Sequence, residues 1–294
     1  MKSFFVFKRG IVAALAFSAA FAATGCLGTD AETETIVVGG GADSVNLAKN
    51  GVALKLYFQG RFGADTLKTG RKFLTAGGDS VRFETAKFYV SEIALVDSTG
   101  KSHYLVGTHL VDMLDSASVA RGYAIVNLKA IPGTYRGVRF SIGVPYDQNH
   151  LDAATQASPL GTASGMFWGW NYGYIFNRIE GKVDSAGVAK GFAYHIGEDY
   201  RKLQVSLYSL TAPTSSLVIE SGHHAKMAAG LAKSAHEVDN HIAVKASYNT
   251  LFSTGLNTSS PLKSSLNVSE RQAHGGPIAD RMFLNSQSLF TLAQ

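Results

Sequence analysis

Apolar and polar residues alternate along several parts of this chain, and the clearest example begins at residue 52. Every second residue from there is apolar and mostly large: Val52, Leu54, Leu56 and Phe58. The residues between them are small or polar at their tips, including Lys55 and Tyr57. Because successive side chains of a strand point to opposite faces, this period of two predicts a half-buried β-strand.

Short runs of β-branched and aromatic residues continue through most of the chain. Turn signals such as Asp97-Ser98-Thr99-Gly100 and Pro132-Gly133 separate them. The further predicted strands are 88–90, 93–96, 103–113, 123–128, 135–144, 166–183, 191–196, 203–210, 216–220 and 242–252. Many short strands joined by turns indicate an all-β domain, most simply an antiparallel β-sandwich.

Helix is a minor part of the predicted fold. The segment 151–156 and the Ala-rich segment 224–235 are compatible with helices. The stretch 253–272 is rich in Ser and Asn, which favours a long loop or insertion. We therefore expect one β-sandwich domain over residues 52–294, with minor helical segments and long loops.

The amino terminus has the pattern of an export signal. A basic start with Lys2, Lys8 and Arg9 precedes a run, 10–23, without any charge, and small residues follow before Cys26. Residues 1–25 are therefore predicted to be a signal peptide. The small residues before Cys26 resemble a bacterial lipobox, although Ala23 stands where Leu is usual, so we expect lipidation at Cys26. An ordinary signal peptide with an incidental cysteine is the alternative.

Residues 26–51 are polar, rich in glycine and poor in large apolar side chains, and they are expected to form a flexible tether. The run Ile36-Val37-Val38-Gly39-Gly40-Gly41 resembles a strand that enters a dinucleotide-binding loop. Ser44 occupies the position of the last glycine, and little helix-compatible sequence follows. The segment therefore does not indicate a nucleotide site.

Composition and charge exclude several classes of function. Removal of the signal peptide leaves 24 basic and 22 acidic side chains, a net charge of +2, which is no electrostatic footprint for nucleic acid. Cys26 is the only cysteine, so the mature chain has no internal disulfide. The sequence has no Gly-x-Ser-x-Gly elbow, phosphate-binding loop or His-Glu-x-x-His motif. We therefore do not expect an enzyme.

The most unusual segment, Met166–Tyr174, reads MFWGWNYGY and contains both tryptophans of the chain. On a single strand, one face would be wholly aromatic, with Trp168, Trp170, Tyr172 and Tyr174. A core strand that fills a sandwich explains such a face, and so does a surface for sugar stacking. Indoles and phenols in a row can also pass oxidising equivalents.

Histidine is the other chemical signal, with nine residues in the chain. His150 follows a predicted strand end, His195 lies near the end of another, and His274 precedes Gly275-Gly276-Pro277. Imidazole is a good ligand for copper and zinc, and loop edges of a β-scaffold are suitable places to hold a metal. Any one of these histidines alone is more simply explained as a surface or hydrogen-bonded side chain, and their proximity in the fold cannot be read from the sequence.

Taken together, these segments resemble the MbnP-like family, named after the methanobactin-associated periplasmic copper-binding protein. The matching stretches occur in order over roughly residues 52–293. They are FYVSEIALVDSTGK (88–101), HLVDM (109–113), IPGTYRGVRFSIGVPYDQNH (131–150), MFWGWNYGYIFNRIEGK (166–182), FAYHIG (192–197) and AHGGPIADRMF (273–283). The tryptophan-centred stretch and the GVP…NH stretch are the more specific ones.

The resemblance implies properties that the composition does not show. Proteins of this family are exported β-sandwich proteins, often lipoproteins, that bind copper. A dihaem peroxidase of the MauG-like class commonly accompanies them and oxidises a tryptophan to kynurenine near the metal. By this resemblance, Trp168 or Trp170 is the oxidised residue, and His150, His195 and His274 are the candidate copper ligands. We hypothesise in addition that Tyr172 and Tyr174 relay the oxidation from a haem that docks outside.

The resulting expectation is a copper-binding protein of the periplasm or cell surface, anchored as an outer-membrane lipoprotein. It would be a substrate of the peroxidase and not itself an enzyme. The alternative from another class is a membrane-anchored β-sandwich recognition module for carbohydrate or another ligand. A metal-dependent hydrolase comes third, because no acid–base motif supports it.

Overall fold

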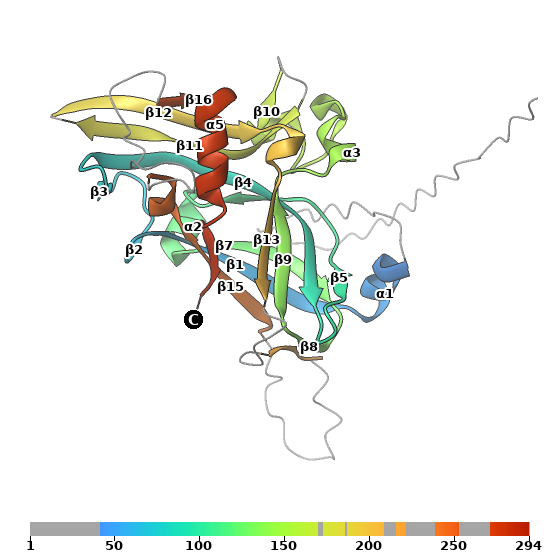
Figure 1. Ribbon diagram of the computed structural model, residues 1–294. Helices are drawn as coiled ribbons and strands as arrows, with labels where there is room; N and C mark the ends of the chain where they lie inside the picture. Colours follow the sequence, from blue (N-terminus) through green and yellow to red (C-terminus); the bar gives the residue numbers. More distant parts are fainter. Residues whose placement is uncertain are drawn as a thin grey trace, which may run out of the picture. The chain divides into compact units, whose positions relative to one another are not determined.

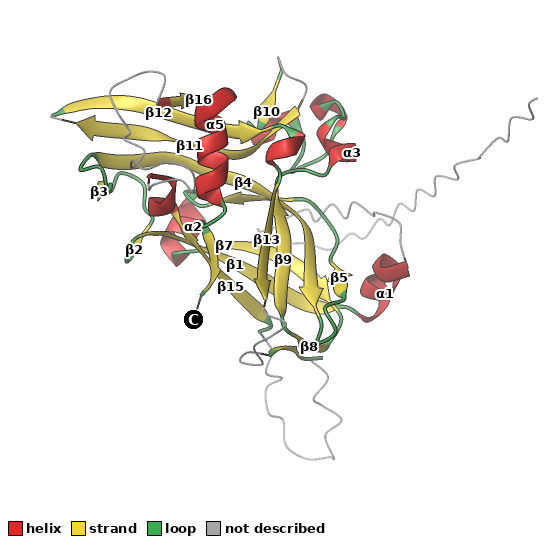
Figure 2. Ribbon diagram, viewed as in Figure 1, coloured by secondary structure: helices red, strands yellow, loops and turns green. Residues whose placement is uncertain are grey.

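The computed structural model describes residues 42–169, 173–185, 187–208, 216–221, 239–252 and 271–293. Several predictions fall outside these residues. They are the signal peptide 1–25, the lipidation at Cys26, the roles of Trp170 and Tyr172, the helix 224–235 and nearly all of the loop 253–272. Strands predominate in the described part (Figure 2).

One sheet is built around β1 (Val52–Phe62), the strand with the clearest alternation. Leu54, Leu56 and Phe58 are buried as predicted, whereas Val52 is half-buried, and the strand continues four residues beyond Phe58. β1 pairs antiparallel with β7 (Ala124–Ala130) and parallel with β15 (His241–Ser247). β2 (Asp65–Thr66) and β17 (Phe290–Leu292) complete the sheet. Figure 1 shows β7, β1 and β15 side by side.

The second sheet is larger, and its path is β13-β9-β4-β11-β12-β16. β4 (Ser80–Val96) and β11 (Gly173–Ser185) lie at its centre, and β12 (Val188–Gly197) pairs with β11. The remaining members are β3 (Phe73–Leu74), β5 (Ser102–Tyr104), β6 (His109–Asp112), β9 (Gly137–Ile142), β10 (Phe167–Trp168), β13 (Leu203–Tyr208) and β16 (Gln272–Ala273). β8 (Gly133–Tyr135) and β14 (Leu217–Ile219) form a separate pair.

Aromatic rings join the two sheets across one apolar core. Phe58 of β1 meets Phe88 of β4 and Phe140 of β9 edge to face, with ring centroids 5.3 and 5.7 Å apart. Phe290 of β17 contacts all three of these rings. Packing of this kind between the inner faces of two sheets confirms the predicted β-sandwich. The parallel pairs β1–β15 and β12–β16 make the sheets mixed, which the sequence did not predict.

A smaller cluster covers the outer face of the second sheet. Phe88 and Tyr89 are neighbours on β4, so they point to opposite faces: Phe88 enters the main core and Tyr89 the smaller cluster. Trp168, Tyr174 and Phe176 are buried with Tyr89. The segment between β9 and β11 therefore packs onto this sheet and contributes a second apolar layer.

Helices are short and occur at the ends of strands. α1 (Ala42–Asn50) lies in the predicted tether, whose last part is therefore helical, with Leu47 buried in the core. The others are α2 (Ser116–Arg121), α3 (Tyr146–Asn149), α5 (Gly276–Ser286) and the 3₁₀ turns Ala153–Thr155, Thr162–Ser164, Asp199–Arg201 and Tyr248–Phe252. Asp115 caps α2 by accepting hydrogen bonds from the backbone N–H groups of Ala117 and Ser118. Among the described residues, no helix is long and apolar enough to cross a membrane.

Several predicted elements have different limits in the structure, for local reasons. The runs 88–90 and 93–96 belong to one strand, β4, which bulges where Glu92 adopts a φ of 50°. The run 103–113 is two strands, because Gly107 turns the backbone with a φ of 111°. The expected helix 151–156 contains only the 3₁₀ turn Ala153–Thr155. The strand expected over 242–252 ends at Ser247.

Candidate metal centre

A cluster of charged side chains lies on the outward face of the second sheet, around Glu180 of β11. Its carboxylate accepts hydrogen bonds from Arg178 of β11 at 3.0 and 3.1 Å and from Thr85 of β4 at 3.0 Å. The ring nitrogen Nε2 of His195 on β12 lies 2.6 Å from the same carboxylate. Arg178 and His195 are cross-strand partners, so the period of two places all four side chains on one face.

The electrostatics of this cluster favour an ionised Glu180. Burial acts to raise the pKa of its carboxyl, but the hydrogen bonds from His195, Arg178 and Thr85 together outweigh this and hold the pKa below its usual value. The pKa of His195 is lowered, first because burial disfavours the charged ring and further because of the positive charge of His274 and Arg178. Glu180 opposes this shift without reversing it.

These charges determine which nitrogen of His195 faces a ligand. An ionised carboxylate only accepts hydrogen bonds, so the Nε2 that faces Glu180 carries the proton of a neutral ring. The lone pair of the neutral imidazole is then on Nδ1. A carboxylate that holds one imidazole nitrogen in this way is a common support for a metal-binding histidine. His195 is therefore oriented as a ligand would be.

His274 comes to the cluster from the far end of the chain. β16 pairs parallel with β12, and Tyr194 lies opposite Ala273, so His274 follows at the level of His195. The two imidazole rings are 4.6 Å apart between centroids and nearly perpendicular. Arg201, almost wholly buried, holds the following helix α5 by hydrogen bonds to Asp280. The structure thus brings together two of the three predicted histidine ligands.

Trp168 lies over the end of the strand that carries His195. The indole packs against Gly197, where an added Cβ would be 2.5 Å from the ring atom Cζ3. Position 197 is two residues after His195 on β12, so both positions face the same side of the sheet. Trp168 is 4% exposed. A glycine is needed at position 197 because the tryptophan occupies the space of a side chain.

The prediction of one aromatic strand face over 166–174 is wrong. The chain reverses between Trp168 and Gly173, and β10 pairs antiparallel with β11. Tyr174 therefore lies opposite Phe167, with ring centroids 5.3 Å apart, and not beside Trp168 on one strand face. Its buried hydroxyl donates to the backbone oxygen of Leu160 at 2.6 Å, and burial raises its pKa to about 12. Neither Trp168 nor Tyr174 is exposed for stacking on a sugar.

His150, the third predicted ligand, lies beyond the end of β12. Its Nε2 is 2.8 Å from Asp199, and its ring contacts that of Tyr146. The neighbouring Asn149 donates to Asp199 and accepts from the backbone N–H of Tyr174. His150 is thus paired with Asp199, just after β12, and among the described residues no hydrogen bond, ion pair or ring contact joins it to His195 or His274. Within the ranges that the structure describes, no three His, Cys, Asp or Glu side chains are arranged to hold a metal ion.

Sequence reasoning did not single out Glu180, Arg178 or Thr85. The sequence did contain a signal for Arg178 and Glu180, because two residues of opposite charge at this spacing lie on the same face of a strand. Glu180 also lies in the quoted stretch MFWGWNYGYIFNRIEGK, next to the tryptophan motif. The pairing with Thr85 and His195 depends on strand neighbours and is visible only in the folded chain.

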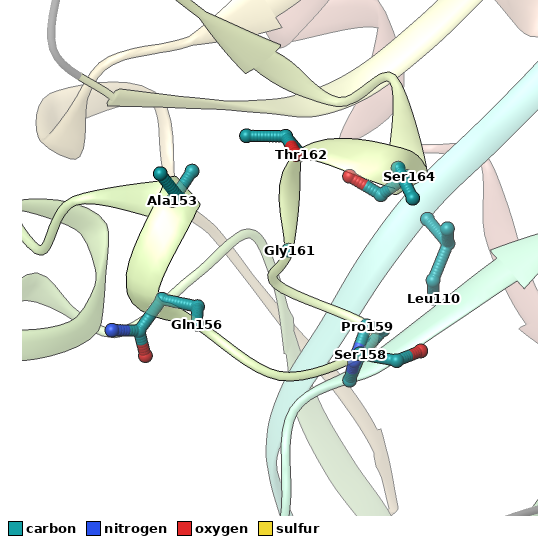
Figure 3. A pocket seen from close by; sticks show the side chains of 10 residues that line it. Leu110, Ala153, Gln156, Ser158, Pro159, Gly161, Thr162 and Ser164 are labelled. Carbon is teal, nitrogen blue, oxygen red and sulfur yellow. The ribbon is translucent and has the colours of Figure 1, made fainter.

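A pocket of about 370 Å³ opens among the loops that precede β10. Figure 3 shows its wall, to which Leu110, Gln156 and the hydroxyl side chains of Ser158, Thr162 and Ser164 contribute. None of its ten lining residues is acidic, basic or aromatic. None of the predicted site residues lines it, so the pocket is separate from the histidine cluster.

Comparison with known proteins gives one family and one solved structure. The family model described as MbnP matches residues 52–269. The solved structure of MbnP from Methylosinus trichosporium is similar over 70% of this chain and 79% of that chain, with 17% sequence identity and a TM-score of 0.44. A search of the curated proteins found no match.

Proposed function

The chain belongs to the MbnP family, and from this premise we propose that it is an exported copper-binding protein whose site is completed by oxidation of a tryptophan. Membership of the family supports a copper-related role in the periplasm. Lipidation at Cys26 would hold the domain on the outer membrane. A dihaem peroxidase of the MauG-like class would convert Trp168 or Trp170 to kynurenine, with this chain as its substrate.

One observation supports this proposal more than any other: the indole of Trp168 covers Gly197, on the same side of β12 as His195. His195 is held by Glu180 and lies against His274. Two imidazoles suit copper, and the described residues lack a third side-chain ligand beside them. Kynurenine carries an aromatic amine and a ketone, so it would add a ligand at the place where the tryptophan now lies.

The residues of the chain have distinct roles in this proposal. His195 and His274 would bind copper, and His150, which pairs with Asp199, is the further candidate. Glu180 would hold the His195 ring so that its unprotonated Nδ1 faces the copper. Arg178 and Thr85 would keep Glu180 ionised and in place through their hydrogen bonds to its carboxylate. Gly197 would leave room for the modified tryptophan. Storage and delivery of copper are both compatible with such a site.

The test is intact mass and peptide mapping across residues 166–182, with copper quantified on the same sample, after coexpression with the peroxidase. Conversion to kynurenine exchanges one carbon for one oxygen, and mapping assigns it to Trp168 or Trp170. The variants Trp168→Phe and Trp170→Phe should differ: one loses both the modification and the copper, and the other keeps both. Unmodified tryptophans and no copper in the coexpressed protein would overturn the proposal.

The proposed relay has its own test. Tyr172 and Tyr174 changed together to Phe should lower the yield of kynurenine if phenols carry the oxidation. Tyr174 donates to a carbonyl oxygen, which cannot take up a proton, so its oxidation would have to release the proton elsewhere. Phe167→Leu, which alters the ring next to Tyr174, serves as the packing control. Full kynurenine yield in the double variant would exclude an essential phenol relay.

Copper retention should depend on pH in a defined direction. A histidine binds metal only when neutral, so protons compete as the pH falls through its pKa. The pKa of His195 lies below the ordinary histidine value of about 6.5. Copper retention should therefore be complete at neutral pH and should decline only when the pH falls below about 6.5. Copper measured after dialysis across this range checks the expectation, with circular dichroism to detect acid unfolding. Undiminished copper at about pH 4 would argue against histidine ligands.

A further inference from the structure

The outward face of the first sheet carries positive charge and no acidic residue along three adjacent strands. β1, β7 and β15 contain no Asp or Glu. Their outward positions include Lys55 and Arg61 of β1, Lys129 of β7 and Lys245 of β15. Cross-strand partners confirm the common side: Lys55 lies opposite His241, Gln59 opposite Lys245, and Ala53 opposite Lys129. We call this surface the basic face.

Aromatic rings lie among these cations. Tyr57 is between Tyr123 and His241, with ring centroids 4.6 and 5.1 Å away. Asp239, at the margin just before β15, pairs with Lys55 at 3.0 Å, and both side chains remain about half exposed. The histidine cluster of the candidate metal centre is on the other sheet, so the basic face plays no part in the proposed copper site.

We propose that the basic face docks on an anionic phospholipid surface. Lysines near such a surface are attracted by its negative potential, and tyrosine prefers the interfacial region of a bilayer. Lysine is depleted in protein–protein interfaces, because its ammonium group is strongly hydrated. On a lipid surface the long side chains reach the headgroups while they remain solvated. These properties favour lipid over an acidic protein as the occupant.

The path of the chain gives an independent argument. Fifteen residues separate Cys26 from α1, at most about 50 Å when extended. α1 leads through Gly51 directly into β1, and Gly51 lies against Lys129. A lipid at Cys26 would therefore tether the domain through the strand that carries Lys55 and Arg61 of the basic face. This argument rests on the proposed lipidation, whereas the charge pattern of the three strands does not.

The experiment uses the full chain with Cys26→Ser, so that no lipid contributes, and vesicles of phosphatidylcholine with or without phosphatidylglycerol. Binding should require phosphatidylglycerol and weaken as salt is raised. Each lysine is worth about fivefold, so the triple change of Lys55, Lys129 and Lys245 to Gln should weaken binding about a hundredfold. The matched control changes Lys72, Lys101 and Lys182, exposed lysines outside these strands, to Gln.

The outcomes separate this inference from the proposed function. Loss in the test triple with near-normal binding in the control supports the basic face. Equal loss in both triples, or no binding to phosphatidylglycerol vesicles at low salt, overturns it. Copper and kynurenine are measured on the same proteins with the peroxidase coexpressed. Normal copper without vesicle binding removes only the docking inference, and vesicle binding without copper removes only the proposed function.

Discussion

Glu180→Gln is expected to weaken copper binding by about ten- to a hundredfold, the usual effect of removing the group that orients a metal-binding histidine. Glutamine has nearly the same shape but no charge. It can still accept from His195, but it loses the charge-assisted bonds with Arg178 and with the imidazole N–H. The tautomer and orientation of His195 are then no longer fixed. The measurement is a competition titration with a copper chelator at pH 7.

The matched control for this prediction is Glu84→Gln. Glu84 belongs to the same sheet, on β4, and its side chain is half exposed and pairs with Lys182. The Glu84→Gln change removes the same charge without contact with His195. Copper affinity should therefore stay within about twofold of the parent value, since the exposed pair of Glu84 with Lys182 is weak. Equal affinity of the Glu180 variant and the parent protein would show that Glu180 does not position the histidine.

Gly197→Ala is expected to displace Trp168 and to cost about 1–3 kcal/mol in the free energy of unfolding, the usual penalty for overpacking. The new methyl group would be 2.5 Å from the indole and 2.7 Å from the backbone oxygen of Tyr174. The backbone contact cannot be relieved by a rotamer change, so the β10–β11 hairpin must shift. Denaturant unfolding gives the stability, and tryptophan fluorescence reports the environment of the indole.

The copper content of the Gly197→Ala variant tests whether the contact of Trp168 with Gly197 belongs to the copper site or is purely structural. If Trp168 lies where copper binds, the Gly197 variant loses copper under conditions in which it is still folded. Gly191→Ala, on the same strand, is the control, because a methyl group there meets its nearest neighbour only at 3.9 Å. A folded Gly197 variant with normal copper and kynurenine would place the copper site away from Trp168.

Local patterns were sufficient for the class of fold and for the strands with the clearest alternation. The alternation from Val52 to Phe58 identifies β1 and its buried side. Side chains of a strand alternate between its two faces whichever strands pair with it, so this signal is local. α5 was missed, although Pro277 at its first turn and the later buried residues Ala279 and Met282 follow a helical pattern. The preceding Gly275 and Gly276 are typical of a turn, so the sequence did not indicate a helix there.

Other features depend on which segments become neighbours. The alternation in MFWGWNYGY predicts a single strand, and it contains no sign that Phe167 and Trp168 pair antiparallel with Tyr174 and Gly173. The bulge at Glu92 and the parallel pairing of β1 with β15 have no local signature either. Which distant segments pair as strands depends on the packing of the whole core, because many aromatic side chains must fit together at the same time.

The sequence by itself determined the strand-rich class, and it marked the tryptophan-centred motif and the candidate histidines, because each of these depends on residue type and spacing alone. The export signal at the amino terminus stays a prediction of the same kind. Only the tertiary structure decided that His195 meets His274, that His150 pairs with Asp199, and that Glu180 holds His195. The reason is physical: a hydrogen bond or a ring contact requires a few ångströms of approach, and strand pairing between distant segments sets that distance.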